Sequence, residues 1–504
     1  MSNSMQEITA ENSRWIMNSQ ALVEGVLKLP ETLEEISTIL DITGLGEVTE
    51  ARLASPKIAV DGVANFCVLY LDKAGNFSSF NSECTFNHAI DAPTCTPDMR
   101  ILALAEMQDV SYGVVDGSAI SVRAIVSMDI YAMGNRKYGI MDTNPPEKHT
   151  RIKSAAAMIS RVECAKPFRS YVKSELRVPQ SMPAVKRVLS ERGYAMVRSI
   201  VLEPGKAIVE GEVRVFIVYE STDKNAPLQY LTETLPYGEI INDEGIRKGA
   251  SVVVLASLER LEVESDEENP DMLEISAVIN HSLVCRGQNQ MNYIEDLYDE
   301  EAEVELERES IGVCNILARE CQKKIVRLSV EIPDTAPEVS RTLFACAYPK
   351  ITSAKADNDR VMLSGMMGLV LCYTTTDAGP KNTRISVPFE TEVAYPDMRR
   401  GADLWVKSHA EYAIAEGSGR ELEVKCCLDI CIWEVDSGVV EPISGVHFQP
   451  MEGVKQSGVV VYYTNGEETM WDIAKKFKIK KDVMEEITED VKIEKGKRLV
   501  LIRR

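Results

Sequence analysis

Few residues in this sequence stand at spacings suited to catalysis or metal binding. Cys426, Cys427 and Cys431 come closest to a metal-ligand cluster. In a strand, however, Cys427 and Cys431 point to one side and Cys426 to the other, so a three-ligand site would need a distorted backbone. We therefore interpret these cysteines as buried thiols. The histidines stand far apart in the sequence, and none lies near a second ligand type at metal spacing: His88, His149, His281, His409 and His447.

Motifs for enzymatic chemistry are also missing from the sequence. There is no phosphate-cradling loop ending in Gly-Lys-Ser/Thr, no Gly-x-Ser-x-Gly elbow and no His-Glu-x-x-His. The sequence therefore predicts a protein without catalytic residues, metals or cofactors. An enzyme with dispersed active residues would instead show polar clusters in a deep pocket.

Composition places bounds on the class of protein. A chain of 504 residues with 45% hydrophobic residues can form several cores. Its net charge of −22 disfavours nucleic-acid binding. The first twenty residues carry acids where a secretory signal carries Lys or Arg, and no apolar run is long enough for a transmembrane segment. The scattered cysteines favour reduced thiols in a cytosolic compartment over a disulfide framework.

Three stretches of the chain share a pattern with fixed spacings. In each, a proline is followed by a leucine, a glycine and a tyrosine, with the same gaps every time. The defining residues are Pro30, Gly62 and Tyr70; Pro179, Gly211 and Tyr219; and Pro333, Gly365 and Tyr373. A period of about 150 residues is too long for a solenoid and fits tandem whole domains.

Each repeat reads as mostly β. The core segments "KIAVDGVANFCVLY", "KAIVEGEVRVFIVY" and "RVMLSGMMGLVLCY" alternate around a central glycine. A glycine inside a strand indicates a bulge or a close backbone approach. We predict a mainly β fold of three sandwich-like repeats, without predicting whether they pack together or whether the chain self-associates.

Helical segments are expected to connect the repeats. The predicted organisation is a helical lead-in (1–27), repeat 1 (28–142), a helical connector (143–176), repeat 2 (177–296), an acidic helical connector (297–330), repeat 3 (331–448), a linker (449–458) and a small module (459–504). The acidic run from Glu295 to Glu309 is interpreted as a solvated helix face or flexible linker.

The last 46 residues predict a strand, two helices and a strand. "VVVYY" and "RLVLI" form the outer strands. One apolar helix stripe consists of Trp471, Ala474 and Phe477, and the other of Val483, Met484 and Ile487. Trp471 is expected in the small core, with an exposed anchor role as the alternative.

The repeats resemble the SPOCS domain of endospore-forming bacteria. The resemblance rests on the proline-led entries "LKLPET", "LRVPQS" and "VEIPDT", the glycine-centred strand ending in Tyr, and a turn "L-P-Y" at 235–237 or "V-P-F" at 387–389. The first repeat has "C-T-F" at 84–86 instead. The C-terminal module is similar to LysM modules, matching their pattern at Thr469, Trp471, Ile473, Ala474, Ile487, Gly496, Leu499 and Leu501. SPOCS repeats followed by LysM is the layout of SipL-type spore coat assembly proteins.

The LysM resemblance implies a binding groove between two loops. Sugar-binding members carry a glycine before Asp-Thr in the first loop and Asn-Pro in the second. Here Glu467 replaces the glycine, and Thr488 and Glu489 replace Asn-Pro. The predicted partner- or glycan-binding residues are Gly466, Glu467, Glu468, Thr469, Trp471, Thr488, Glu489 and Asp490. The altered loops favour protein docking. The nearby lysines are interpreted first as a solvated face, and the two-signed surface that they give the module also suits docking on another protein.

The resemblance implies a non-enzymatic scaffold in spore coat assembly. Such a protein would act in the mother-cell cytoplasm at the forespore surface, with its LysM module recruiting a SpoIVA-like coat morphogenetic ATPase. The alternative is a module that anchors the scaffold to peptidoglycan, an N-acetylglucosamine polymer, in the cortex or cell wall. An adaptor outside sporulation is the third possibility.

Overall fold

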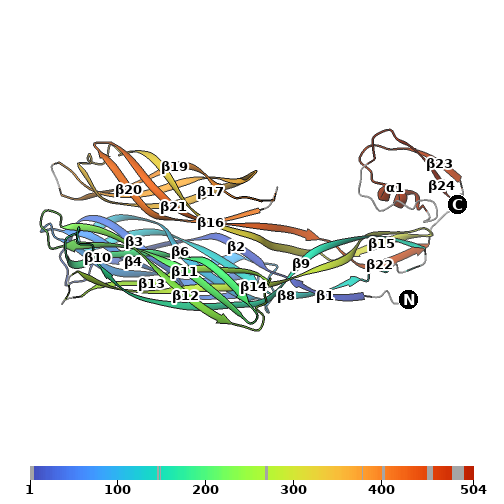
Figure 1. The fold of residues 1–504 in the computed structure, drawn as a ribbon, viewed down its shortest axis with the longest axis horizontal. Helices are drawn as coiled ribbons and strands as arrows, with labels where there is room; N and C mark the ends of the chain where they lie inside the picture. The colour runs from blue at the N-terminus through green and yellow to red at the C-terminus, as the bar shows by residue number, and fades with distance from the viewer. Residues whose placement is uncertain are drawn as a thin grey trace.

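The computed structural model of the chain is almost entirely β-structure, which confirms the predicted mainly β class (Figure 1). It describes residues 5–144, 147, 149–266, 269, 271–376, 379–399, 403–450, 458–479 and 493–503. Within these residues, no helix is long and apolar enough to span a membrane.

Three consecutive sets of strands make up the three repeats. The first set is β1 (Met5–Glu11), β2 (Arg14–Lys28), β3 (Ile36–Ala54), β4 (Lys57–Asp72), β5 (Phe77–Asp91), β6 (Arg100–Asp116), β7 (Ala119–Met133) and β8 (Asn135–Met141). The second is β9 (Thr150–Arg177), β10 (Val185–Glu203), β11 (Lys206–Ser221), β12 (Leu228–Asn242), β13 (Ser251–Ser265) and β14 (Met272–Asp299). The third is β15 (Ala302–Arg308), β16 (Ile311–Glu331), β17 (Arg341–Asp357), β18 (Arg360–Thr374), β19 (Lys381–Ala394), β20 (Asp403–Ser418), β21 (Glu421–Val440) and β22 (Ile443–Pro450). The C-terminal module contains β23 (Gly458–Tyr463), α1 (Met470–Phe477) and β24 (Arg498–Arg503).

The three repeats have the same sheet topology. Each has one sheet in which its first long strand pairs with its last, namely β2-β7-β6, β9-β14-β13 and β16-β21-β20. Each also has a meander of three strands, namely β3-β4-β5, β10-β11-β12 and β17-β18-β19. A bridge from Ala345 to Ala413 joins the two sheets of the third repeat. Apolar residues from both sheets form one buried core in each repeat, as in a β-sandwich.

The tyrosine that recurs in the repeats fixes the entry of each meander. Tyr70, Tyr219 and Tyr373 are all fully buried. Their hydroxyls donate to carbonyl oxygens 36 residues earlier, those of Glu34, Pro183 and Pro337, at 3.2, 3.0 and 3.1 Å. The recurring prolines begin the turn just before this point, since the carbonyls of Pro30, Pro179 and Pro333 each accept a hydrogen bond from the residue three places on.

The recurring glycines lie where the central strand of each meander meets a β-bulge. Gly62, Gly211 and Gly365 pair with Val48, Val197 and Ile351, and the register shifts immediately after each pair. A Cβ atom on these glycines would collide with the carbonyl oxygens of Glu47, Met196 and Lys350. On the other side they pair with Phe86, Tyr237 and Phe389. The predicted turns at 235–237 and 387–389 are therefore strand segments, because the edge strands β12 and β19 tolerate a proline and place an aromatic ring opposite the glycine.

The expected helical connectors are wrong. Residues 150–176 of the first connector lie in β9, residues 5–27 of the lead-in lie in or between β1 and β2, and the stretch 297–330 forms the end of β14, then β15 and β16. Strand β9 pairs with β14 along its whole length, from Thr150 to Arg177. This pairing overrides the local helix propensity of the Ala-rich segment "KSAAAMIS". The acidic run also forms a strand, β15. Its Val304 and Leu306 pack inward, while the glutamates that alternate with them face solvent.

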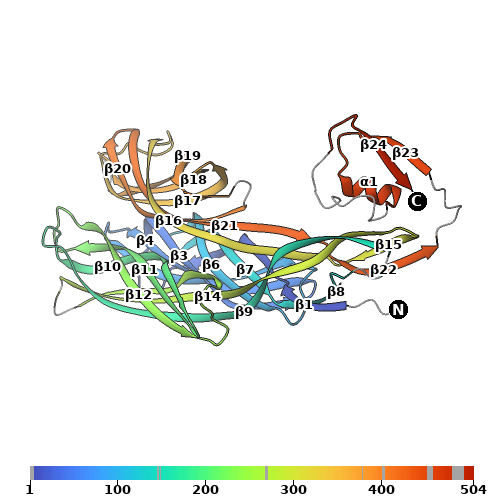
Figure 2. The ribbon, with the colours of Figure 1, turned by 45° about the vertical axis from the view of Figure 1, so that its right-hand side comes forward.

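Extended strands carry each repeat out of its sandwich into a shared arm (Figures 1 and 2). The arm combines the ribbons β1–β8 and β15–β22 with the outer halves of β9 and β14. Apolar residues from all three ribbons pack against one another there, including Ala10, Ile140, Met291, Leu297 and Ile443. The repeats also pack together in the body, through clusters that draw residues from all three. They are therefore not separate beads.

One disulfide departs from the expectation of reduced thiols. Cys321 on β16 bonds Cys431 on β21. The two residues lie directly opposite each other on paired strands, with their Cα atoms 4.1 Å apart. A sequence separation of 110 residues hides this proximity. Cys426 and Cys427 are buried free cysteines, as expected.

A buried histidine in the second repeat makes stability depend on pH. His281 is fully buried, stacks on Phe168 at 4.4 Å and shares a 3.0 Å hydrogen bond with Ser170. Burial lowers the pKa of His281 from 6.5 to about 3. Between these values the unfolded chain binds a proton that the folded chain excludes, so each pH unit of acidification removes about 1.4 kcal/mol of unfolding free energy.

We expect His281→Phe, which keeps an aromatic ring against Phe168, to flatten this slope by about one proton. Urea unfolding measured between pH 7 and pH 4 tests it. His447→Phe is the control, since His447 is exposed and Glu307 raises its pKa, which gives a small effect of opposite sign. An unchanged slope in His281→Phe would show that the buried imidazole is not the cause.

Candidate functional site: the C-terminal module and its seat on the arm

The described part of the C-terminal module is a two-stranded sheet with one helix. Strands β23 and β24 pair antiparallel from Gly458 to Tyr463. Helix α1 begins at a capping box in which the Thr469 hydroxyl accepts from the N–H of Asp472, and the Asp472 carboxylate accepts from the N–H of Thr469. The second predicted helix, with Val483, Met484 and Ile487, lies outside the described residues, as do Thr488, Glu489 and Asp490.

The first predicted loop is a compact turn with one exposed acid. Gly466 has a φ of 91°, and a Cβ there would lie 2.9 Å from the Cβ of Lys495. Asn465 Oδ1 accepts hydrogen bonds from the backbone N–H groups of Glu467 and Glu468. The Glu468 carboxylate accepts from the Tyr462 hydroxyl at 2.7 Å and pairs with Lys476 at 3.3 Å, which lowers the pKa of Glu468. The Glu467 side chain is exposed, in contrast to the partly buried and paired Glu468.

Trp471 is buried, and its contacts extend beyond the module to the arm. Its side chain is 5% exposed and meets the ring of Tyr298, on strand β14 of the arm, edge to face at 5.3 Å. Its indole N–H donates to Asp296 Oδ2 at 2.8 Å. Tyr298 belongs to the same buried cluster as Ile473 and Ala474. The arm thus supplies one wall of the module's core.

Lysines on and after α1 complete the contact between the module and the arm, which we call the seat. Lys475 Nζ lies 2.7 and 2.8 Å from the two carboxylate oxygens of Asp296. Lys478 Nζ pairs with Glu303 at 2.7 Å and donates to the carbonyl oxygen of Ala302 at 2.6 Å. The Tyr298 hydroxyl donates to the carbonyl oxygen of Ile479 at 2.8 Å. One face of α1 therefore holds a protein strand that carries an acid and an aromatic residue.

Sequence reasoning missed the arm side of this seat. Asp296 and Tyr298 are two places apart in a strand, so both side chains lie on one face. The signal was present in the sequence, but the expectation of a helix in this region obscured it.

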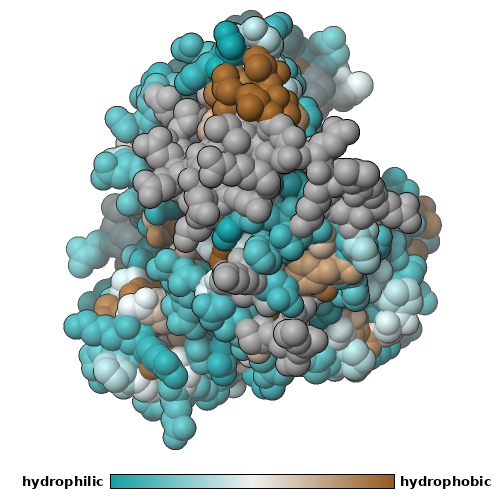
Figure 3. Space-filling model, turned by 90° about the vertical axis from the view of Figure 1, so that its right-hand side faces the viewer, coloured by the Kyte–Doolittle hydropathy of each residue, from teal (hydrophilic) through white to brown (hydrophobic). Residues whose placement is uncertain are grey.

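The outer face of the module's sheet is apolar and open. Val459, Val461, Tyr463 and Val500 are 65, 46, 62 and 54% exposed. Figure 3, viewed from the arm end, shows an apolar area at the module end of the molecule. The seat on the arm leaves this face uncovered.

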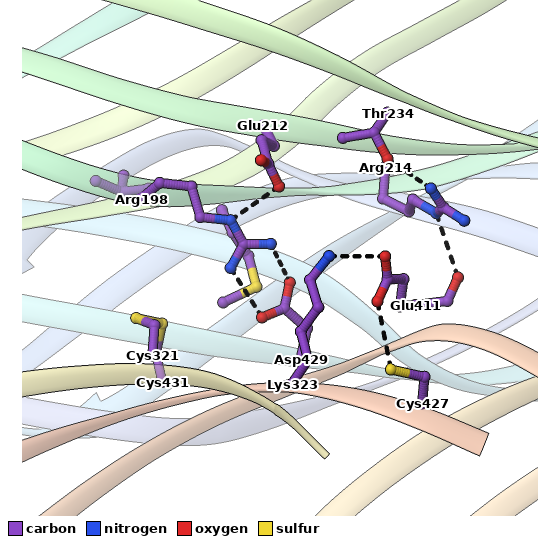
Figure 4. Close-up of polar contacts among 12 residues, drawn as sticks. Arg198, Glu212, Arg214, Thr234, Cys321, Lys323, Glu411, Cys427, Asp429 and Cys431 are labelled. Carbon is purple, nitrogen blue, oxygen red and sulfur yellow. Dashed lines mark hydrogen bonds and ion pairs between the residues drawn. A yellow bond between two sulfur atoms is a disulfide. The ribbon is translucent and has the colours of Figure 1, made fainter. Parts of the chain in front are cut away.

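A second polar cluster joins the second and third repeats (Figure 4). Arg198 on β10 forms a bidentate pair with the fully buried Asp429 on β21, with Nη1 2.8 Å from Oδ1, and its Nε donates to Glu212 at 2.9 Å. Lys323 pairs with Glu411 at 2.7 Å, and the Cys427 thiol donates to Glu411 at 3.3 Å.

This cluster has a structural role. Burial and the neighbouring Glu411 carboxylate raise the pKa of Cys427 to about 11, so its thiol is not a nucleophile at neutral pH. Among the described residues, no three His, Cys, Asp or Glu side chains are grouped to hold a metal ion. The cluster binds one repeat to the next.

The family model described as SipL, SPOCS domain, matches residues 35–115 and 184–266. These segments span β3 to β6 of the first repeat and β10 to β13 of the second. The chain is similar to SipL-type SPOCS proteins. This similarity associates it with sporulation and the spore coat. Comparison with curated proteins and with solved structures gives no significant match.

The SPOCS match covers about a third of the chain. The third repeat lies outside the matched segments, although it has the same strand topology and the same tyrosine and glycine contacts. The C-terminal module also lies outside them, and its LysM assignment remains a prediction.

The seat should depend on Asp296. In Asp296→Asn the Lys475 pair is lost and the Trp471 bond is weakened, which should cost about 1–3 kcal/mol of docking free energy. Hydrogen exchange should then rise in α1 and at the end of β14. Glu305→Gln is the control, because Glu305 is exposed on the same arm and its contact with Gln449 is a long one of 3.4 Å. Equal protection in both variants would mean that Asp296 does not hold the module.

The packing of the second repeat against the third should depend on Asp429. Asp429→Asn leaves the shape intact but removes the partner of a partly buried guanidinium, which should lower the unfolding free energy by about 3 kcal/mol. Glu212→Gln, which alters the more exposed partner of the same Arg198, should cost less than about 1 kcal/mol. Urea unfolding measures both, and equal losses would contradict the assignment.

Proposed function

We propose that this protein is a non-enzymatic scaffold of the spore coat, acting in the mother-cell cytoplasm at the forespore surface. The similarity to the SipL SPOCS domain supports a coat role. A structural role fits the polar clusters, which join repeats and contain buried, protonated thiols instead of nucleophiles. Three repeats and a terminal module on one chain suit multivalent tethering, in which several modest interfaces raise the effective concentration of partners.

We further propose that the C-terminal module is a LysM-type unit used for protein docking, with a SpoIVA-like coat ATPase as its partner. This proposal rests on one observation: helix α1 already binds a protein strand, because Trp471 and Lys475 contact an acid and an aromatic residue on β14. The first loop presents Glu467 where sugar-binding relatives have glycine. The open apolar sheet face gives a second surface of the kind found in the centres of protein interfaces.

Two parallel assays on the full chain test the docking function. We expect it to bind the SpoIVA-like ATPase in titration and to remain in the supernatant with insoluble peptidoglycan. Glu467→Lys should weaken ATPase binding about tenfold, because it reverses the exposed charge of the first loop. Glu83→Lys makes the same charge change on an exposed strand of the first repeat and should have little effect.

Sedimentation with peptidoglycan, together with no ATPase binding, would instead identify a glycan anchor and overturn the docking proposal. Equal effects of Glu467→Lys and Glu83→Lys would show that the first loop is not the contact.

A further inference from the structure

A cavity of about 240 Å³ lies where the three repeats meet in the body. Corresponding strands of all three repeats line it, with Thr43 on β3, Arg192 on β10 and Tyr348 on β17. Its lining includes charged and polar residues as well as apolar ones, and so differs from the apolar clusters around it. None of the described residues of the C-terminal module lines it.

One group of lining residues includes a guanidinium whose hydrogen bonds go to hydroxyls instead of carboxylates. The Arg192 guanidinium donates to the hydroxyls of Tyr348 and Tyr230, at 3.1 and 3.0 Å, so its hydrogen-bond partners are neutral. Arg384 lies 3.5 Å from Asp41 and 3.7 Å from Asp109. Asp109 lines the cavity and is 61% exposed, whereas the buried Asp41 lies behind the lining and near both guanidinium groups.

A second group has an excess of negative charge. Glu106 pairs with Lys407 at 2.7 Å, and Asp129 is the further carboxylate near that ammonium. His409, which stacks on Tyr194 at 4.3 Å, has its pKa lowered by burial and stays neutral at pH 7. No ion pair among the described residues connects this group to the arginine group.

Polar atoms at the cavity have no protein partner. Thr43 is 5% exposed, yet its hydroxyl makes no hydrogen bond within the described part of the chain. The same holds for His409 Nε2, whose nearest carboxylate oxygen is 3.8 Å away on Glu106. Buried polar groups normally find a partner in the protein or in bound solvent. A hydroxyl left open at a polar cavity indicates that a water or ligand atom completes it.

We propose that this cavity binds a small zwitterion of the amino-acid type. Its carboxylate would meet Arg192 and Arg384, its ammonium group would meet Glu106 and Asp129, and Thr43 would hydrogen-bond between them. A molecule with one charge satisfies only one group, and a neutral molecule satisfies neither. Because strands of all three repeats form the cavity, occupancy would tighten their packing.

The test uses the purified full chain and a homologous series of ω-amino acids: glycine, β-alanine, 4-aminobutyrate and 6-aminohexanoate. Calorimetric titration and thermal unfolding at constant ionic strength report binding. We expect one chain length to bind best, and its single-charge analogues, the carboxylic acid and the amine of equal length, to bind at least about tenfold more weakly. Equal binding of zwitterion and analogues, or no binding at millimolar concentration, overturns the proposal.

Variants then locate the site. Asp129→Asn and Arg384→Gln should each weaken the zwitterion about tenfold, the first without affecting the carboxylic acid and the second without affecting the amine. Thr43→Val keeps the side-chain shape and remains informative if a charge variant fails to fold. Thr49→Val, an exposed position on the same strand, is its matched control. Unaltered binding in Thr43→Val and both charge variants would place the ligand elsewhere.

Discussion

A charge pair is buried where the three repeats meet at the base of the arm. Arg286 on β14 is 0% exposed and lies 2.8 Å from Glu11 on β1. Its guanidinium rests on the ring of Trp15 at 4.3 Å. The Ser160 hydroxyl donates to the same Glu11 oxygen at 2.8 Å and lies 3.4 Å from the carbonyl oxygen of Cys314 on β16. An unpaired buried charge costs several kcal/mol. Arg286 therefore keeps its charge partner only when strands of the first and second repeats are in place, which favours the assembled body over separate domains.

The residues that recur in the repeats serve a different purpose. The tyrosine hydroxyl fixes the entry of each meander, and the glycine admits the bulge and the facing aromatic ring. These contacts lie inside each sandwich and leave its surfaces free to differ. Equivalent positions around the cavity accordingly carry a threonine in one repeat and an arginine in the next. Repetition specifies the fold three times, and the differences between copies create the joints and the cavity.

The β class and the repeats could be predicted because their evidence is local and occurs three times in the chain. The arm could not be predicted, since β9 is a strand only through its pairing with β14, whose partner residues lie 95 to 149 positions away. The disulfide Cys321–Cys431 was hidden for the same reason. At the site, Trp471 was identified as important, but its partners Asp296 and Tyr298 lie in a region expected to be helical. Long-range pairing, which a single sequence does not display, accounts for each of these errors.

The seat of the module determines which of its surfaces can meet a partner. Docking on the arm occupies the face of α1 that carries Trp471 and Lys475, and a partner seeking that face would compete with an intramolecular ligand at high effective concentration. The turn at Glu467 and the apolar face of β23 and β24 remain open. A partner that binds these surfaces meets no such competition. The arm thus positions the module and leaves its free surfaces at the far end from the body (Figure 2), which is the geometry a tether requires.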